Sequence, residues 1–250
     1  MRIVYFGFDL FADCFRAVVN TKGVEVMALY TFKTDDVFEF NREVVEIAKM
    51  HNIPVHYEKI TAEALEGYFN AGCDFTLSAG YIHKIPIIDH KNFKGVNVHP
   101  ALLPIGRGAW PYPCTILKGL KKDGVTLHKI EEGFDTGDII LQKSYKVGRK
   151  ETLDTLIKKS QKYGVKLVKK LLSDFSGFWS NAKPQVNGEY WAEPTDKERT
   201  IISEMSVSEA KLLVRAFGSY GVIFEGQMFK NKTKKYKKIS LKDGQLKLFY

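Results

Sequence analysis

The stretch RIVYFGFDLFADCFRAVVNTKGVEVMALYTF, residues 2–32, changes twice from one hydrophobic period to another. Residues 2–8 are a short apolar run that predicts a buried strand. Residues 9–19 carry apolar side chains at helical spacing, and residues 24–32 are again strand-like. A strand, a helix and a strand in this order are the building unit of a parallel sheet. The stretch therefore predicts an α/β protein.

The same alternation continues downstream. Thr61 is expected to cap a helix that runs to Phe69, because its hydroxyl can accept hydrogen bonds from the free amides of the first turn. The expected architecture is a Rossmann-like, mostly parallel sheet flanked by helices, in which ligands bind beyond the carboxyl ends of the strands. The other elements expected here are a helix over 38–50, a strand at 53–55, and strands over 73–78 and 96–99.

A break rich in Ser, Asn, Gly and Pro covers residues 173–194 and is the predicted domain boundary. We expect an N-terminal domain over 1–180 and a small C-terminal α+β subdomain over 181–250. The further elements expected are two strands within 124–147, helices over 151–172 and 206–217, and short C-terminal strands with a hairpin turn at Asp243-Gly244.

Composition places the chain among ordinary globular proteins. It has 250 residues, of which 44% are apolar and 27% charged, enough for a full core without disulfides. Its three cysteines, Cys14, Cys73 and Cys114, are widely spaced and form no CxxC pair, so we expect free thiols and no zinc. We see no targeting segment and no apolar run of the ~20 residues that span a bilayer. The expected location is the cytoplasm, without membrane attachment.

The net charge of +9 has two interpretations. One is an anionic partner such as nucleic acid, a membrane surface or a phosphorylated small molecule. The other is a lysine-rich solvated surface. Much of the excess lies in Lys158–Lys170 and Lys230–Lys238, and no aromatic ladder accompanies either run. The solvated surface is favoured, and nucleic acid is not the expected partner.

The first turn excludes a dinucleotide site. It reads Gly7-Phe8-Asp9-Leu10-Phe11-Ala12, with a single glycine. The second and third glycines of the dinucleotide fingerprint let the backbone meet pyrophosphate and let the helix pack closely. A phosphate loop of the GxxxxGK[ST] type is also missing from the sequence.

Residues 96–104, VNVHPALLP, are the most informative stretch for chemistry. Asn97 and His99 stand two apart on a predicted strand, so they share one face at roughly 6–7 Å separation. Pro100 favours an extended His99 and ends the strand there. Both polar side chains then lie at the carboxyl end, where open α/β sheets bind ligands.

An imidazole can move a proton near neutral pH, and an Asn amide can donate to an oxygen that becomes negative. Neither is a nucleophile, so the pair indicates direct transfer between two bound substrates. Asp135 or Asp138, in the glycine-containing stretch 133–138, could supply a carboxylate that favours protonated His99. Structural roles are the commoner alternative for such residues: a hydrogen-bonded core histidine and a plain turn. The remaining histidines are first interpreted as structural: His51, His56, His83, His90 and His128.

These residues resemble the folate-dependent formyltransferases, which include methionyl-tRNA formyltransferase, glycinamide ribonucleotide transformylase and the sugar N-formyltransferases. The resemblance covers roughly residues 1–175 and is specific because the motifs come in order. They are Phe6-Gly7 with Phe11-Ala12, Leu77–Pro86, Asn97-Val98-His99, Leu102-Leu103-Pro104, Arg107-Gly108, Gly124–His128 and Asp135-Thr136-Gly137.

The resemblance implies the formyltransferase fold, with N10-formyltetrahydrofolate as co-substrate and no metal. It implies a catalytic triad of Asn97, His99 and Asp135, which favours Asp135 over Asp138. The other implied contacts are His83, Lys84 and Ile85 on one side of the pterin pocket, Glu131, Glu132, Gly133 and Phe134 on its other side, and Arg107, Phe8 and Asp9 at the acceptor substrate.

Two positions depart from the family pattern. Ala101 stands where the family usually has Ser before Leu-Leu-Pro, and Ala109-Trp110 stands where several sugar-directed members have a second Arg. The second departure indicates a differently shaped acceptor pocket.

The C-terminal part decides the expected acceptor. Residues 191–217, ending in Arg215-Ala216-Phe217, resemble the segment after the catalytic domain in sugar and tRNA formyltransferases, which the glycinamide ribonucleotide enzyme lacks. The roughly 35 residues after Ala216 are too few for the barrel usual in the tRNA enzyme. We therefore expect a dTDP-, UDP- or GDP-linked amino sugar, for surface polysaccharide or O-antigen synthesis. Methionyl-tRNA, kept open by the charge, and a non-catalytic folate- or nucleotide-binding regulator are the alternatives. The apolar end, 246–250, is compatible with a homodimer interface or with a core face.

Overall fold

The computed structural model describes residues 1–34, 40–230 and 236–249, which group into two compact units. The sheet unit comprises Met1–Arg107, Gly124–Ser144 and Ser160–Glu189. The small unit comprises Gly108–Asp123, Tyr145–Lys159 and Tyr190–Tyr250. The expected boundary between 180 and 181 stays a prediction. Parts of three expected features lie outside the described residues: the helix start at 38–39, the basic run at 231–235, and Tyr250.

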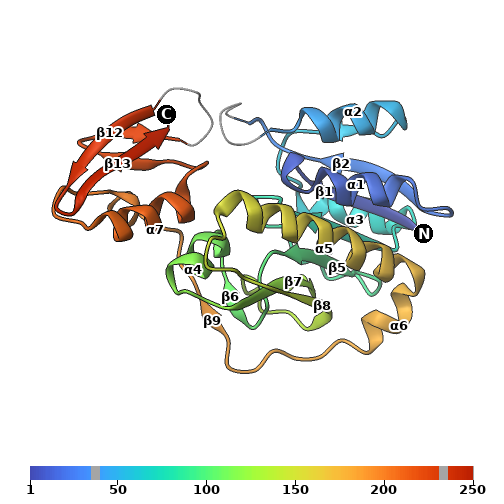
Figure 1. Cartoon of the computed structure of the whole chain (residues 1–250). Coiled ribbons are helices and arrows are strands. Elements are labelled where there is room, and N and C mark those ends of the chain that lie inside the picture. Colours follow the sequence, from blue (N-terminus) through green and yellow to red (C-terminus); the bar gives the residue numbers. More distant parts are fainter. Residues whose placement is uncertain (35–39, 231–235, 250) are drawn as a thin grey trace. The chain divides into compact units, whose positions relative to one another are not determined.

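A seven-stranded sheet forms the centre of the fold, in the order β3-β2-β1-β4-β5-β7-β8 (Figure 1). The strands from β3 to β5 pair in parallel, and β7 runs antiparallel to β5. The predicted α/β class with a mostly parallel sheet is thus confirmed. The strand bounds are β1 (Arg2–Gly7), β2 (Glu25–Tyr30), β3 (Val55–His56), β4 (Phe75–Ala79), β5 (Gly95–His99), β7 (Lys122–Lys129) and β8 (Ile139–Lys146).

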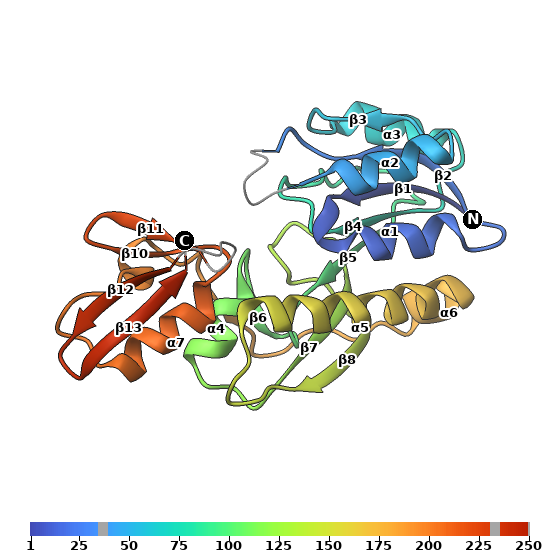
Figure 2. The ribbon, with the colours of Figure 1, turned by 45° about the horizontal axis from the view of Figure 1, so that its top comes forward.

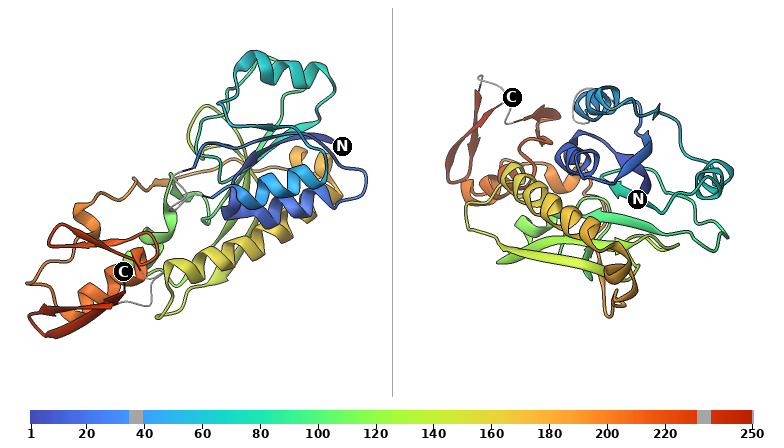
Figure 3. Two further views of the ribbon diagram at one scale, coloured as in Figure 1. Left: turned by 90° about the horizontal axis from the view of Figure 1, so that it is seen from above. Right: turned by 90° about the vertical axis from the view of Figure 1, so that its right-hand side faces the viewer.

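Helices cover both faces of this sheet. Figure 3 shows α1 (Ala12–Val19) and α2 (Arg42–Met50) on one face and α3 (Ala62–Asn70) on the other. Right-handed crossovers explain this arrangement, because the chain runs from β1 through β2 to β3 in one direction and then returns past β1 to form β4. The predicted cap is confirmed, since the Thr61 hydroxyl accepts a hydrogen bond from the Ala64 amide at 3.1 Å.

The single glycine of the first turn serves strand packing. Gly7 ends β1 and pairs with Ala79 of β4. A Cβ added to Gly7 would lie 2.6 Å from the Ala79 carbonyl oxygen, so no larger residue fits between the two strands. The turn continues into a short 3-10 helix, Asp9–Phe11, and then into α1. This geometry accounts for one glycine without any phosphate ligand.

The expected break at 173–194 is more ordered than its composition indicates. Helix α5 (Leu153–Ser173) is followed by α6 (Phe175–Ser180), whose first turn is capped by the Asp174 carboxylate. Lys183 then forms an isolated antiparallel β-bridge with Ile139, and β9 (Glu189–Tyr190) pairs with β6 (Ile105–Arg107). Residues 173–189 are therefore an ordered part of the sheet unit. Residues that favour turns also supply caps, so a composition of this kind is compatible with ordered structure.

The small unit is built on two helices and two hairpins. Helix α7 (Val207–Phe217) begins at a capping box in which Ser206 and Glu209 bond each other's backbone, and it contacts α4 (Pro111–Leu117) and β13. Figure 2 shows the last hairpin beside α7. Leu241 pairs with Gly244, so the turn residues are Lys242-Asp243, one position before the predicted turn. The hairpins are β10 (Val222–Phe224) with β11 (Gln227–Phe229), and β12 (Tyr236–Leu241) with β13 (Gly244–Phe249).

The membrane expectation concerns helix length and polarity. Over residues 1–34, 40–230 and 236–249, the structure contains no helix with the length and apolar character that a bilayer crossing requires.

Candidate active site

Asn97 and His99 lie at the carboxyl end of β5, as the sequence predicts. The strand ends at His99, directly before Pro100. Positions 97 and 99 share one face of the strand because side chains alternate along it. His99 is only 4% exposed, so its ring is held by protein groups.

Asp135 reaches this strand end from the loop between β7 and β8. Its Oδ1 atom lies 3.5 Å from His99 Nδ1 and accepts a hydrogen bond from Asn97 Nδ2 at 3.3 Å. Asp138, the alternative carboxylate, instead forms an ion pair with Lys129 at 2.9 Å. The structure therefore brings Asn97, His99 and Asp135 together and places Asp138 in a different contact.

The loop that carries Asp135 has an unusual backbone. Asp135 has φ of 55°, in the left-handed region that non-glycine residues seldom adopt. A Cβ added to Gly137 would lie 2.0 Å from the Lys129 carbonyl oxygen, so the loop runs directly against β7. The Asp-Thr-Gly motif thus combines a strained aspartate with a glycine that permits close approach.

His128 belongs to the same cluster, although the sequence analysis interpreted it as structural. It stands directly opposite Asn97 in the antiparallel pair of β5 and β7. Its Nε2 atom lies 3.2 Å from Asn97 Nδ2 and 3.3 Å from Asp135 Oδ1. The sequence motif Gly124–His128 ends at this residue and could have pointed to it. The motif places His128 in the cluster only when β7 is known to pair with β5 in this register.

Hydrogen-bond partners fix the proton positions on the two rings. His99 Nε2 lies 2.7 Å from the Gly106 carbonyl oxygen, and His128 Nδ1 lies 2.7 Å from that of Lys129. A carbonyl only accepts, so each of these nitrogens must carry a proton and donate it. In the neutral rings, the other nitrogen of each is bare and faces Asp135 Oδ1. Asn97 can donate to His128 Nε2, which leaves His99 Nδ1 as the place where an added proton would form an ion pair with Asp135.

The pKa of His99 is lower than its ordinary value. Burial is the main cause, and His128 acts in the same direction. Asp135 and the Gly106 carbonyl raise this pKa but do not overcome burial. Asp135 thus favours the protonated ring, as expected of a neighbouring carboxylate, but burial opposes the charge more strongly in the protein alone.

Arg107 and Gln185 form a second layer beside this cluster. Arg107 lies on β6 and donates from both Nε and Nη2 to Gln185 Oε1, each at 3.0 Å. Gln185 Nε2 donates to the backbone carbonyls of Asp135, at 2.9 Å, and Gly137, at 2.7 Å. No motif in the sequence analysis pointed to Gln185, since its partners are distant in the chain.

The two segments predicted to line the pterin pocket lie close to each other. Lys84 Nζ lies 6.0 Å from the centre of the Phe134 ring, and Phe134 is 65% exposed. His83 meets Phe32 and Tyr81 edge to face, and the side chain of Ile85 is buried in the core, so only its backbone is free to line a pocket. The remaining predicted residues, Glu131, Glu132 and Gly133, lie in the exposed part of the loop before Phe134.

Phe8 and Asp9, predicted to meet the acceptor, have contacts at the start of α2. The Asp9 carboxylate accepts hydrogen bonds from the amides of Glu43 and Val44, at 3.1 and 3.0 Å. Phe8 packs against Phe32, with ring centres 5.3 Å apart. The carboxylate of Asp9 therefore serves as a cap for α2, and its predicted contact with the acceptor stays a prediction.

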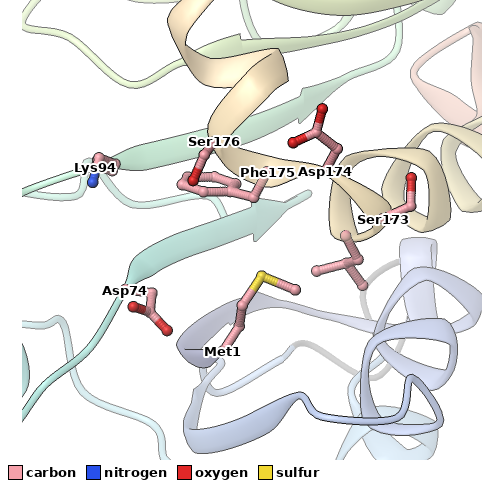
Figure 4. A pocket seen from close by; sticks show the side chains of 8 residues that line it. Met1, Asp74, Lys94, Ser173, Asp174, Phe175 and Ser176 are labelled. Atoms are coloured by element: carbon pink, nitrogen blue, oxygen red, sulfur yellow. The ribbon is translucent and has the colours of Figure 1, made fainter.

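A hollow of about 280 Å³ lies at the opposite edge of the sheet, where β1, β4 and β5 begin (Figure 4). Its lining residues are Met1, Asp74, Lys94, Leu172, Ser173, Asp174, Phe175 and Ser176. None of these eight described residues belongs to the cluster around His99, so this hollow is separate from the candidate active site.

Comparison with known proteins defines the class. Residues 2–172 match the sequence pattern of the family described as formyl transferase, so the chain belongs to the formyl transferase family. A methionyl-tRNA formyltransferase from Prochlorococcus marinus subsp. pastoris is 30% identical over 70% of this chain. One from Alkaliphilus oremlandii is 29% identical over 92% of it and 78% of its own length. The chain spans only 56% of the length of the Prochlorococcus relative.

Solved structures show the same fold. The N-formyltransferase from Helicobacter canadensis, solved in complex with folinic acid and dTDP-3-aminofucose, is 21% identical, with a TM-score of 0.70 and coverage of 99% of this chain and 98% of that one. HypX from Aquifex aeolicus, in complex with tetrahydrofolic acid, is 18% identical, with a TM-score of 0.73 and coverage of 99% of this chain and 43% of that one.

Proposed function

We propose that this chain transfers a formyl group from N10-formyltetrahydrofolate to the amine of a nucleotide-linked amino sugar. The observation that carries the proposal is the convergence of Asn97, His99 and Asp135 at the carboxyl edge of the sheet, in a member of the formyl transferase family. This edge is where open α/β sheets bind their ligands.

The folate carrier, when bound, supplies the formyl carbon: transfer joins this carbon to the acceptor nitrogen, breaks its bond to N10, and moves one proton from the amine side to N10. Asn97 Nδ2 keeps its bond to Asp135 Oδ1 and exchanges His128 Nε2 for the formyl oxygen as negative charge develops there. His99 reacts in its protonated form, with a proton from solvent on Nδ1 against Asp135, and donates its Nε2 proton to the same oxygen by exchanging the Gly106 carbonyl for it. Nε2 then delivers this proton to N10, directly or through water, and takes up the proton that the amine loses, so His99 ends in the form in which it began.

Asp135 has two tasks in this scheme. Its charge raises the pKa of His99 against the effect of burial, so that a buried ring can accept the proton it needs. Its Oδ1 atom also orients the amide of Asn97. His128 accepts from the same amide and is fixed by the Lys129 carbonyl, which makes it a positioning residue for Asn97.

The residues predicted to hold the folate fit a flat, partly apolar ring system. Phe134 offers an exposed aromatic face, and Ile82 is 53% exposed beside His83. Lys84 lies over Phe134, so the segment 83–85 and the segment 131–134 are neighbours and could form two sides of the pterin pocket. Backbone groups at 83–85 would provide the polar contacts of the pterin.

The acceptor class is proposed from two supports. The fold matches the Helicobacter canadensis enzyme over nearly the whole of both chains, and the bound dTDP-3-aminofucose of that enzyme is a nucleotide-linked amino sugar. Arg107 is a half-buried cation beside the cluster, suited to a phosphate oxygen of such a substrate. We propose surface polysaccharide or O-antigen synthesis as the process that uses the product. We also propose that the protein acts in the cytoplasm and forms a homodimer.

Methionyl-tRNA is the second candidate acceptor. The curated relatives carry this name, and the net charge of +9 suits a polyanionic partner. A non-catalytic folate- or nucleotide-binding regulator is the third possibility, and it would retain ligand without turnover.

Mass spectrometry tests these alternatives directly. The protein is incubated with N10-formyltetrahydrofolate and a panel of dTDP-, UDP- and GDP-linked amino sugars, with methionyl-tRNA alongside and a His99→Asn variant as control. A formyl mass gain on one nucleotide sugar, lost in the variant, would support the proposal. A gain only on tRNA would replace the acceptor, and folate binding without any transfer would contradict the enzymatic function.

A further inference from the structure

Gln185 lies in the segment between α6 and β9, and its side chain makes four hydrogen bonds within the sheet unit. Oε1 accepts twice from the Arg107 guanidinium, and Nε2 donates to the carbonyls of Asp135 and Gly137. All of these contacts measure 2.7 to 3.0 Å. The amide is therefore satisfied on both of its ends.

Only an amide fits this position. Arg107 needs an acceptor, whereas the two carbonyls need a donor, so Oε1 must face Arg107 and Nε2 must face the loop. A carboxylate would satisfy Arg107 but would set acceptor against acceptor at the loop. The guanidinium thus fixes the orientation of the amide, and the amide fixes the loop.

The carbonyls that Gln185 holds flank the strained part of the loop. Asp135 has φ of 55°, and such a conformation persists only where its surroundings maintain it. The same residue places its carboxylate against His99 and Asn97. A bond at the Asp135 carbonyl therefore acts on the group that sets the charge and orientation of His99.

Arg107, the second partner of the Gln185 side chain, is also connected to His99. Arg107 follows Gly106, whose carbonyl accepts the hydrogen bond from His99 Nε2. Gly188 leaves space for the guanidinium, because a Cβ there would lie 2.2 Å from Arg107 Cζ. Both segments that contact the His99 ring are thus joined through Gln185 and Arg107.

We propose that Gln185 is a positioning residue that holds the Asp135 carboxylate against His99 by tying the strained loop to Arg107. Its effect on turnover rests on the proposed formyl transfer, whereas its effect on His99 is a property of the protein alone. The titratable side chains that act on His99 are Asp135, from the loop, and His128, from β7, and on the β6 side the ring meets the Gly106 carbonyl.

The pKa is tested with Gln185→Met, which removes the donor for the loop without adding a charge. Asp135 raises the pKa of His99, so displacement of its carboxylate should lower that pKa further. Turnover is tested with Gln185→Glu, which keeps the acceptor for Arg107 and removes the donor for the loop, but whose new carboxylate would itself raise the pKa of His99. The pKa is measured by NMR titration of the histidine ring signals in the full chain without substrates, with the His99 signal assigned from His99→Asn. With active protein, kcat should fall by about tenfold to a hundredfold at nearly unchanged KM, since small misplacements of a reacting group have such effects.

The matched control is Gln161→Met. Gln161 is also partly buried in the sheet unit and donates its amide to a backbone carbonyl, that of Leu10, at 2.7 Å. Both methionine variants should lower the melting temperature, but only Gln185→Met should lower the pKa of His99. Gln185→Leu, also uncharged, repeats the test should Gln185→Met fail to fold.

A downward shift of the His99 pKa in Gln185→Met or Gln185→Leu, with no shift in Gln161→Met, supports the proposal even if the acceptor proves to be different. An unchanged His99 titration in a folded, uncharged Gln185 variant would overturn it. An equal shift in Gln161→Met would also overturn it, because the effect would then follow general destabilisation.

Discussion

The end of β5 and the loop between β7 and β8 supply the same cluster in different ways. Asn97 and His99 are placed by local structure: a buried strand, its two-residue period, and a proline that ends it. Asp135 is placed by distant partners, because its carbonyl is held by Gln185, 50 residues later in the chain. A strand carries its side chains rigidly, whereas a loop needs other elements to hold its conformation.

The difference separates two kinds of residue in the site. Substitutions at the strand end should remove a chemical group and leave the architecture intact. Substitutions around the loop should act through the position of Asp135, and their effects should appear in the titration of His99 as well as in the rate.

The largest effect is expected at the strand end. His99→Asn removes the proton donor, and Asn97→Ala removes the amide that donates to the formyl oxygen. Loss of one such donor typically lowers kcat by about 10²–10³-fold. Steady-state kinetics and circular dichroism check the prediction; a folded His99→Asn variant with nearly full activity would show that the strand end is not the catalytic site.

The next largest effect is expected from the loop, where Asp135 should influence how stability depends on pH. Burial lowers the pKa of His99 from its ordinary value of 6.5, so the folded protein favours the neutral ring and loses stability as pH falls through that range. Asp135→Asn removes the charge that raises this pKa, so the pKa should fall further and the loss of stability between about pH 7.5 and about pH 5.5 should grow. Melting curves across this range check it. An identical pH dependence in the two proteins would show that Asp135 does not act on His99.

A smaller effect is expected at Gly188, which lies beside the Arg107 guanidinium. Gly188→Ala places a Cβ against the Arg107 guanidinium, which is the flexible end of a side chain and can move away. Gln185 keeps its bonds to the loop, so kcat should fall only severalfold, less than the roughly tenfold or greater loss expected of Gln185→Glu. If Gly188→Ala matches Gln185→Glu in its loss, Arg107 itself contributes to the reaction.

The smallest effect on activity should come from the small unit. Ser206→Ala removes the hydroxyl that accepts from the Glu209 amide at the start of α7. Loss of such a cap costs about 1 kcal/mol in the free energy of unfolding. Urea unfolding should detect this loss of stability, while kcat should stay within about twofold of the wild type, because Ser206 contacts none of the residues of the candidate active site named above. A large fall in kcat would show that α7 influences the site.

The sequence predicted what neighbours along the chain determine. The alternation of strands and helices, the end of β5 at His99 and the cap at Thr61 all follow from local patterns, and the structure confirms them. His128 and Gln185 could not be predicted in this way. His128 joins the cluster through the register of two strands, and Gln185 through the segment that was predicted as a domain boundary. The net direction of the His99 pKa shift could not be predicted either, because burial, its main cause, depends on the whole core.

Two aspartates on one loop separate the catalytic cluster from its surroundings. Asp135 meets His99 and Asn97, whereas Asp138, three positions later, pairs with Lys129. The measurement is the rate of formyl transfer from N10-formyltetrahydrofolate, to whichever acceptor the wild type uses, by Asp135→Asn and Asp138→Asn. If Asp135 acts on His99, Asp135→Asn should lose activity on the order of 10²-fold and Asp138→Asn should retain most of it. Equal losses, or a larger loss for Asp138→Asn, would show that Asp135 is not the catalytic carboxylate.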